Sequence, residues 1–234
     1  MTLPKDNQTL QTIHTSSTLQ EKQAQGAALF AGFTQEDFDV FTIPGLEPRM
    51  EALIGLVRPK LNLLGERLSP ALSVLCGEEM FPHVAKHARR TINPPIDTWV
   101  AFAHNKRGYK AHPHFQIGLF ESHLFIQFAI IYECTNKLIF AGHALDKLSE
   151  IQALVPQHYV WSGDHMVPEG TRHSDMDEQE LEKLLGRLKT VKAAEALCGL
   201  HLDRKDPLLA DGEKLIRTIE QTFETLIPLY RMAF

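Results

Sequence analysis

The stretch DTWVAFAHNKRGYKAHPHFQIGLFESHLFIQFAIIYE, residues 97–133, decides the fold of this 234-residue chain. It contains three apolar runs that are rich in aromatic and β-branched residues, with the short polar segments NKRG and ES between them. Apolar runs separated by turn residues in this way are typical of consecutive hairpins. We therefore expect three neighbouring strands here that form the main part of a sheet.

Helical patterns lie on both sides of this stretch. Apolar residues recur at helical spacing over residues 46–57, so a helix is expected there that ends near Pro59. A second helix is expected from Lys60, and Ser69 followed by proline predicts a new helical turn, because proline suits the first position of a helix. The other predicted elements are helices over residues 137–154, 178–191 (after Ser174) and 212–227, and short strands around Trp161 and over residues 195–202.

The start of the folded region has two interpretations. Thr34 followed three residues later by Asp37 is typical of a helix start, since both side chains can accept hydrogen bonds from free amide groups. Residues 37–43, DFDVFTI, alternate instead in the manner of a strand. Both interpretations stay open at this point.

Helices that flank a mixed or mostly antiparallel sheet give an α+β fold with two layers. Residues 1–25 hold thirteen Thr, Ser, Gln and Asn, a composition typical of a mobile tail. No internal repeat and no Gly/Ser-rich or Pro-rich linker divides the rest of the chain. We expect a polar N-terminal tail over residues 1–32 and a single α+β domain over residues 33–234.

The composition predicts a globular protein in a reducing compartment. Hydrophobic residues make up 44% of the chain, and the three cysteines include no CxxC pair, which argues against a disulfide framework. The longest apolar run, residues 124–132, is far shorter than the roughly 20 residues that span a bilayer. The N-terminus lacks the basic and apolar parts of a secretory signal. A cytoplasmic location without membrane contact is expected.

The charges are distributed unevenly along the chain. The formal net charge is -5, yet ten Lys and Arg stand against five Asp and Glu between Arg49 and Lys110. The remainder holds 14 basic and 24 acidic residues. Such asymmetry is a hint of an anionic partner. The alternative is that these cations pair with the acidic helices of the second half or face solvent.

Two short turns concentrate the positive charge. ARRTINPP carries Arg89 and Arg90 before a stiff Asn-Pro-Pro elbow, and NKRGYKAHPH carries Lys106, Arg107 and Lys110 around a glycine. Arginine binds phosphate or carboxylate through two parallel hydrogen bonds, and lysine adds a point charge. If the sheet brings the turns together, these cations surround one cleft. The predicted anion-binding residues are Arg89, Arg90, Lys106, Arg107, Tyr109, Lys110, His112 and His114.

Ten of the twelve histidines lie between His83 and His173 and raise the question of a metal. His83 and His87 are spaced to share a helix face, but HVAKH lacks the glutamate of HExxH metalloproteases. His112 and His114 are spaced to share a strand face, yet zinc usually needs a third protein ligand. The sequence does not place the candidates for that ligand, which are His104, His143, Asp164 and His165. We expect neither a metal nor a cofactor.

The sequence leaves catalytic residues unassigned. It contains no GxSxG elbow, P-loop, GxGxxG, DxDxDG loop or paired CxxC. Cys134 follows a predicted strand and is a candidate nucleophile, with a buried inert thiol as the preferred interpretation. Asp164 and His165 lie in a predicted loop, where functional side chains often occur. Whether the protein is an enzyme stays open.

Several segments carry a resemblance to a known family. FTQEDFDVFTIPGLEPRM, RPKL, ARRTINPPIDTWVAFAHNKRGYKAHPHFQIGLF and IYE, in this order and spacing, resemble the YktB-like family of uncharacterised bacterial proteins. The resemblance runs from about Phe33 to the last helix, and residues 89–120 are its most specific part. It implies a cytoplasmic bacterial protein with one α+β domain, resembling the catalytic domain of biotin and lipoate ligases and class II tRNA synthetases. No catalytic residues carry over, because the family is uncharacterised.

The resemblance also contains a departure. Those ligases clamp phosphates with a Gly/Arg-rich loop, whereas KRGYK here has a single glycine and ARRTINPP has none. The departure argues against nucleotide activation and leaves simple anion binding open. We expect a domain that binds a small phosphorylated or carboxylated ligand in a basic cleft.

Two other functions remain as alternatives. The first is nucleic-acid binding, with Tyr109 and Trp99 stacking on bases, although core packing is the preferred interpretation of Trp99. The second is a non-catalytic interaction protein without a ligand.

Overall fold

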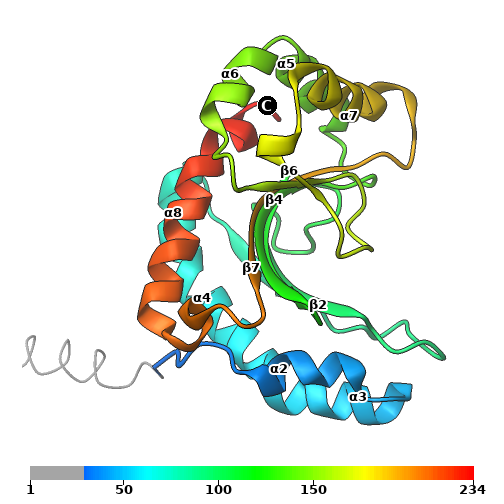
Figure 1. Cartoon of the computed structure of the whole chain (residues 1–234), viewed down its shortest axis with the longest axis vertical. Coiled ribbons are helices and arrows are strands. Elements are labelled where there is room, and N and C mark those ends of the chain that lie inside the picture. Colours follow the sequence, from blue (N-terminus) through cyan, green and yellow to red (C-terminus); the bar gives the residue numbers. More distant parts are fainter. Residues whose placement is uncertain (1–28) are drawn as a thin grey trace, which may run out of the picture.

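A computed structural model describes residues 29–234, so the predicted tail over residues 1–32 lies almost entirely outside the described residues (Figure 1). One antiparallel sheet of seven strands has the order β1-β2-β3-β4-β7-β5-β6. The strands are β1 (Phe81–Val84), β2 (Asp97–Ala103), β3 (His114–Phe120), β4 (His123–Ile130), β5 (Val160–Ser162), β6 (Thr171–Arg172) and β7 (Ala196–Asp203). The three strands predicted from residues 97–133 are confirmed as neighbours in this sheet.

Along the sequence, helices lie before the first strand, between the strands and at the end of the chain. The α-helices are α2 (Gln35–Asp39), α3 (Leu46–Ala52), α4 (Arg58–Cys76), α5 (Lys137–Leu145), α6 (Leu148–Leu154), α7 (Glu178–Thr190) and α8 (Gly212–Arg231). Shorter turns are η1 (Val40–Thr42), the π-helical η2 (Leu53–Val57), η3 (His173–Asp175) and η4 (Pro207–Ala210). The fold is α+β. None of the helices in the described part of the chain is both long and apolar enough to cross a membrane.

The open question at the start of the folded region is answered in favour of a helix. Thr34 is the N-cap of α2, and its backbone N–H donates to the Asp37 carboxylate over 2.7 Å. Asp37 also receives an ion pair from Lys60 of α4. The helix start is therefore held from within the helix and from a neighbouring one.

The prolines do not end helices where the sequence suggested. Helix α3 continues through η2 into α4, and Pro59 lies in the first turn of α4. Helix α4 also continues through Pro70, and α8 runs past Pro228 to Arg231. The predicted helix ends near Pro59 and Pro228 and the predicted new turn at Pro70 are wrong, because packing of long helices against the sheet outweighs one lost backbone bond.

One other predicted helix differs from the structure. The single helix expected over residues 137–154 is two helices, because Lys147 leaves the helical conformation with φ -129° and ψ 28°. Helix α7 covers Glu178–Thr190, so the helix predicted over residues 178–191 is confirmed, with Asp177 rather than Ser174 at its start. The Asp177 carboxylate accepts the N–H of Glu180 over 2.8 Å and thereby caps the helix.

The sequence patterns missed strand β1. The predicted helix face shared by His83 and His87 is wrong, since His83 lies in β1 opposite Ala101 of β2. His87 lies in the following loop with a positive φ of 53°. The four-residue strand FPHV contains a proline and a histidine, so it lacks the apolar alternation that marks the other strands.

Helices α4 and α8 cover one face of the sheet, and α5, α6 and α7 lie together at the end where β4 stops and β7 begins (Figure 1). Alternate strand residues face α8. The ring of Phe223 in this helix contacts the rings of Phe102 and Phe115, whose centres lie 5.9 and 4.9 Å from its own. This aromatic layer is the centre of the hydrophobic core.

Gly199 of β7 is required by the close pairing of β7 with β4. It lies opposite Gln127, and a Cβ at this position lies only 2.0 Å from the carbonyl oxygen of Ile126. Gly199→Ala therefore forces the two central strands apart, and we expect a loss of about 2 kcal/mol or more in the free energy of unfolding. Urea unfolding measures this loss.

The matched control is Gly186→Ala on α7, where a Cβ meets no atom within 4 Å. Alanine is about 1 kcal/mol better than glycine inside a helix, so this variant is expected to be as stable as the parent or more stable. A Gly199→Ala protein with unchanged stability contradicts the packing argument.

Candidate functional site

The sheet face opposite α4 and α8, called the loop face below, carries buried polar side chains. Gln127 Nε2 donates to Gln116 Oε1 over 3.0 Å, and Gln116 Nε2 donates to His114 Nε2 over 2.9 Å. His114 Nδ1 in turn donates to the carbonyl oxygen of His112 over 2.8 Å. Because each member finds a partner, this chain of hydrogen bonds holds polar groups in place beneath the loops.

His114 is neutral in this arrangement. It is fully buried, and its two ring nitrogens act as one donor and one acceptor, which only the uncharged imidazole provides. Burial lowers the pKa of His114 to about 4. The residue therefore serves as a fixed hydrogen-bonding group under the loops.

Tyr109 lies above this polar chain. Its hydroxyl accepts the indole N–H of Trp99 over 3.1 Å, and its ring contacts those of His83 and His114, with ring centres 5.9 and 4.9 Å away. Burial raises the pKa of Tyr109 to about 12, so the hydroxyl keeps its proton at neutral pH. The ring and its hydroxyl are held in one orientation.

A cavity of about 690 Å³ opens beside Tyr109, and we call it the basic pocket. Its lining includes four cations, one carboxylate and two histidines: Lys86, Arg89, Arg107, Lys110, Glu133, His83 and His112. Lys110 Nζ pairs with Glu133 over 3.1 Å. Within residues 29–234, the other three cations make no ion pair.

The basic pocket brings together five of the eight predicted site residues. They come from two turns, the β1–β2 loop and the β2–β3 turn, and are Arg89, Arg107, Tyr109, Lys110 and His112. Arg89 from the first basic turn and Arg107 and Lys110 from the second thus line the same cavity. Whether an anion occupies it stays a prediction.

The other three predicted residues lie outside the lining of this pocket. Arg90 Nη1 donates to the carbonyl of Asn93 over 3.4 Å, within its own loop. Lys106 Nζ lies 6.0 Å from the centre of the Phe81 ring. His114 is buried below, and it does not share a strand face with His112, because β3 begins only at His114.

Three charged or histidine residues of the lining, His83, Lys86 and Glu133, were not predicted as part of the cleft. His83 belongs to β1, the strand that the apolar pattern did not reveal, and Lys86 follows this strand. His83 Nε2 lies 2.9 Å from the carbonyl of Asn105, which links β1 to the basic turn. The positive charge of Lys86 within the basic segment was the one available signal.

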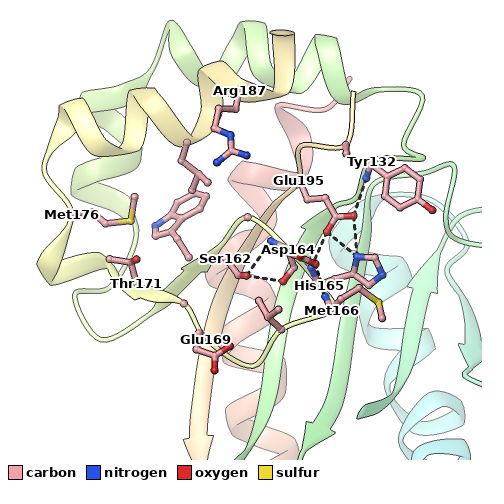
Figure 2. A pocket seen from close by; sticks show the side chains of 16 residues that line it. Tyr132, Ser162, Asp164, His165, Met166, Glu169, Thr171, Met176, Arg187 and Glu195 are labelled. Carbon is pink, nitrogen blue, oxygen red and sulfur yellow. Dashed lines mark hydrogen bonds and ion pairs between the residues drawn. The ribbon is translucent and has the colours of Figure 1, made fainter. Parts of the chain in front are cut away.

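A second cavity, of about 740 Å³, lies beside the β5–β6 loop, and we call it the loop pocket (Figure 2). Asp164 and His165 come from this loop, and Glu195 directly precedes β7. Arg187 of α7 lines the same cavity. Figure 2 shows Asp164, His165 and Glu195 turned toward one another.

Glu195 is the buried centre of this group, with only 4% of its surface exposed. Its carboxylate accepts the backbone N–H of His165 over 2.8 Å and that of Tyr132 over 3.2 Å. It also lies 2.8 Å from His165 Nδ1. Burial lowers the pKa of His165, but the hydrogen bond and charge of Glu195 outweigh it, so the pKa lies above its ordinary value.

A buried lysine fixes the turn that leads to Glu195. Lys137 of α5 donates from Nζ to the carbonyl oxygens of Lys192, over 2.6 Å, and of Val191 and Ala194, each over 3.4 Å. Sequence reasoning named Asp164 and His165 without placing them and missed Glu195. No local signal marks Glu195, because its partners His165 and Tyr132 lie 30 and 63 residues earlier in the chain.

Comparison with known proteins gives one consistent match. A family model described as "Domain of unknown function (DUF1054)" matches residues 33–230. A UPF0637 protein of Bacillus velezensis is 54% identical over 200 residues, which cover 86% of this chain and 95% of the relative. UPF0637 proteins of Bacillus licheniformis and Bacillus cereus B4264 are 52% and 46% identical over 86% of this chain and 95% and 96% of their own lengths. These names state no activity.

The neutral state of His114 makes stability depend on pH. Its pKa of about 4 in the folded chain lies below the ordinary value of 6.5, so between these values the unfolded chain binds more protons. The free energy of unfolding therefore falls as the pH falls from 6.5 to 4, by about 1 kcal/mol per pH unit from this residue near pH 5.

His114→Asn keeps a donor and an acceptor but removes the titrating ring. We expect this variant to show a shallower loss of stability between pH 6.5 and 4, measured by urea unfolding at several pH values. His158→Asn, at an exposed position, is the matched control. Equal slopes in the parent protein and His114→Asn contradict the assignment.

Proposed function

The chain belongs to the DUF1054 family, whose function is unknown, and we propose that it binds a small phosphorylated or carboxylated ligand in the basic pocket. One observation carries the proposal: four Lys and Arg side chains line a single cavity that contains one carboxylate. A cavity of about 690 Å³ has the size usual for small-molecule sites, about 300–1,000 Å³.

The pocket has uncompensated positive charge. Lys86, Arg89 and Arg107 line the same cavity without a carboxylate partner among the described residues. Repulsion between the positive charges destabilises this group of cations when no anion is bound. A bound anion offsets the repulsion, because it accepts a charge-assisted hydrogen bond from each cation. Arginine suits phosphate and carboxylate because its donors match their planar pairs of oxygens.

The neutral groups of the pocket supply hydrogen bonds rather than charge. Burial lowers the pKa values of His83 and His112, so both rings are uncharged at neutral pH. Tyr109, which retains its proton, adds a further uncharged side chain to the lining of the cavity. A ligand with an anionic end and a polar body fits this combination better than a simple inorganic ion.

The alternatives have less support. Nucleic-acid binding relied on Tyr109 and Trp99 as stacking platforms, whereas Tyr109 lies between two histidines and accepts the indole N–H of Trp99. The hypothesis of a non-catalytic interaction protein without a ligand does not explain why four cations line one cavity. The YktB-like identity, the similarity to ligase catalytic domains and the cytoplasmic location stay predictions.

Anion binding is tested by thermal shift of the full chain with pyrophosphate, citrate and a nucleoside monophosphate at fixed ionic strength. We expect at least one of them to raise the melting temperature. Arg107→Ala and Lys110→Ala are each expected to weaken its binding about tenfold, because each removes a charged hydrogen-bond donor. Glu133→Gln, which removes the carboxylate from the lining, is expected to strengthen binding.

The control is Lys183→Ala, an exposed cation of α7 outside the pocket, which should leave the shift unchanged. If none of the three anions shifts the melting temperature, or if both pocket variants bind as the parent does, the proposal is wrong. A loss of affinity in Glu133→Gln also counts against it.

A further inference from the structure

Two carboxylates lie close together at the edge of the loop pocket, just beyond the ladder that joins β5 and β7. This ladder ends with Ser162 opposite Leu197. Asp164 lies two residues after Ser162, Glu195 lies two residues before Leu197, and an oxygen atom of each carboxylate lies within 4.8 Å of the other. Carboxylates at this distance repel each other, so the position calls for a positive charge between them.

Three ligand atoms meet at this point. One carboxylate oxygen each of Asp164 and Glu195 and a ring nitrogen of His165 lie within 4.8 Å of one another. Neither acid is paired with a lysine or arginine in the described part of the chain, and Arg187 lines the cavity without forming an ion pair. The buried Glu195 therefore has His165 as its one source of positive charge among these residues.

We propose that Asp164, His165 and Glu195 bind a divalent transition-metal ion, of the Zn²⁺ or Mn²⁺ type, at the wall of the loop pocket. Two carboxylates and one imidazole form a mixed oxygen and nitrogen set, which suits Zn²⁺, Fe²⁺ and Mn²⁺ better than Mg²⁺ or Ca²⁺. The ion takes the place of the proton between His165 and Glu195, since a metal-bound imidazole nitrogen is unprotonated.

The surroundings hold these ligands in place. The N–H groups of His165 and Tyr132 orient the Glu195 carboxylate, and the N–H of Met166 donates to Asp164 Oδ1 over 2.8 Å. Lys137 fixes the turn before Glu195. Such supporting hydrogen bonds are typical of metal sites in proteins. Three protein ligands beside a cavity leave coordination positions for water or a ligand in the loop pocket.

The test is isothermal titration of the full chain, freed of metals with a chelator, with Zn²⁺, Mn²⁺ and Mg²⁺ separately. We expect one Zn²⁺ or Mn²⁺ per chain with a dissociation constant below about 10 μM and weaker binding of Mg²⁺. His165→Ala removes a direct ligand and is expected to weaken binding about a hundredfold. Co²⁺ added instead should give a visible absorption band that this variant loses.

A second variant guards against loss of the fold. Asp164 is exposed, so Asp164→Asn is expected to fold normally, by circular dichroism, while binding the metal at least tenfold more weakly. His158→Ala removes an exposed histidine outside the cluster and should bind as the parent does. The proposal is overturned if neither Zn²⁺ nor Mn²⁺ binds at 100 μM, or if Asp164→Asn binds as tightly as the parent. It is also overturned if His158→Ala abolishes binding.

Discussion

The pairing of β4 with β7 is the constraint on which the centre of the sheet and the loop pocket depend. It joins a strand from the middle of the chain to one near its end, over the ladder from His123 opposite Asp203 to Ile130 opposite Ala196. The same pairing puts Glu195 beside Tyr132 and lets β5 attach to the other edge of β7. Without it, the β5–β6 loop has no anchor and the loop pocket has no wall.

The buried polar groups of the loop face explain why the loops lie where they do. An apolar sheet face can pack against any apolar surface. The buried side chains of His114, Gln116 and Gln127 instead need hydrogen-bonding partners at particular positions. Two of these partners belong to the turn before β3, where the carbonyl of His112 accepts from His114 and the ring of Tyr109 covers it. The polar chain thus ties the basic turn to the sheet, which places the cations of the basic pocket.

Local sequence patterns predict those elements of the fold that are determined by residues close together in the sequence. The strands over residues 97–133 and the stripe of α8 are apolar and regular, and Arg107 and Lys110 stand out because their turn is visibly basic. Strand β1 is short and polar, so its place comes only from pairing with β2. Glu195 likewise gains its role from a loop about thirty residues away. Such non-local contacts leave no periodic signal in the sequence.

The two pockets are electrostatically connected through the end of β4. Glu133 lines the basic pocket and pairs with Lys110. Burial raises the pKa of Glu133, but Lys110 and, more weakly, His165 lower this pKa by a larger amount, so it lies below its ordinary value. Tyr132, its neighbour, lines the loop pocket. Positive charge at His165 therefore acts on the same carboxylate that pairs with Lys110. If both proposed ligands bind, a cation in the loop pocket and an anion in the basic pocket attract each other, and the coupling free energy between the two sites is the same in both directions.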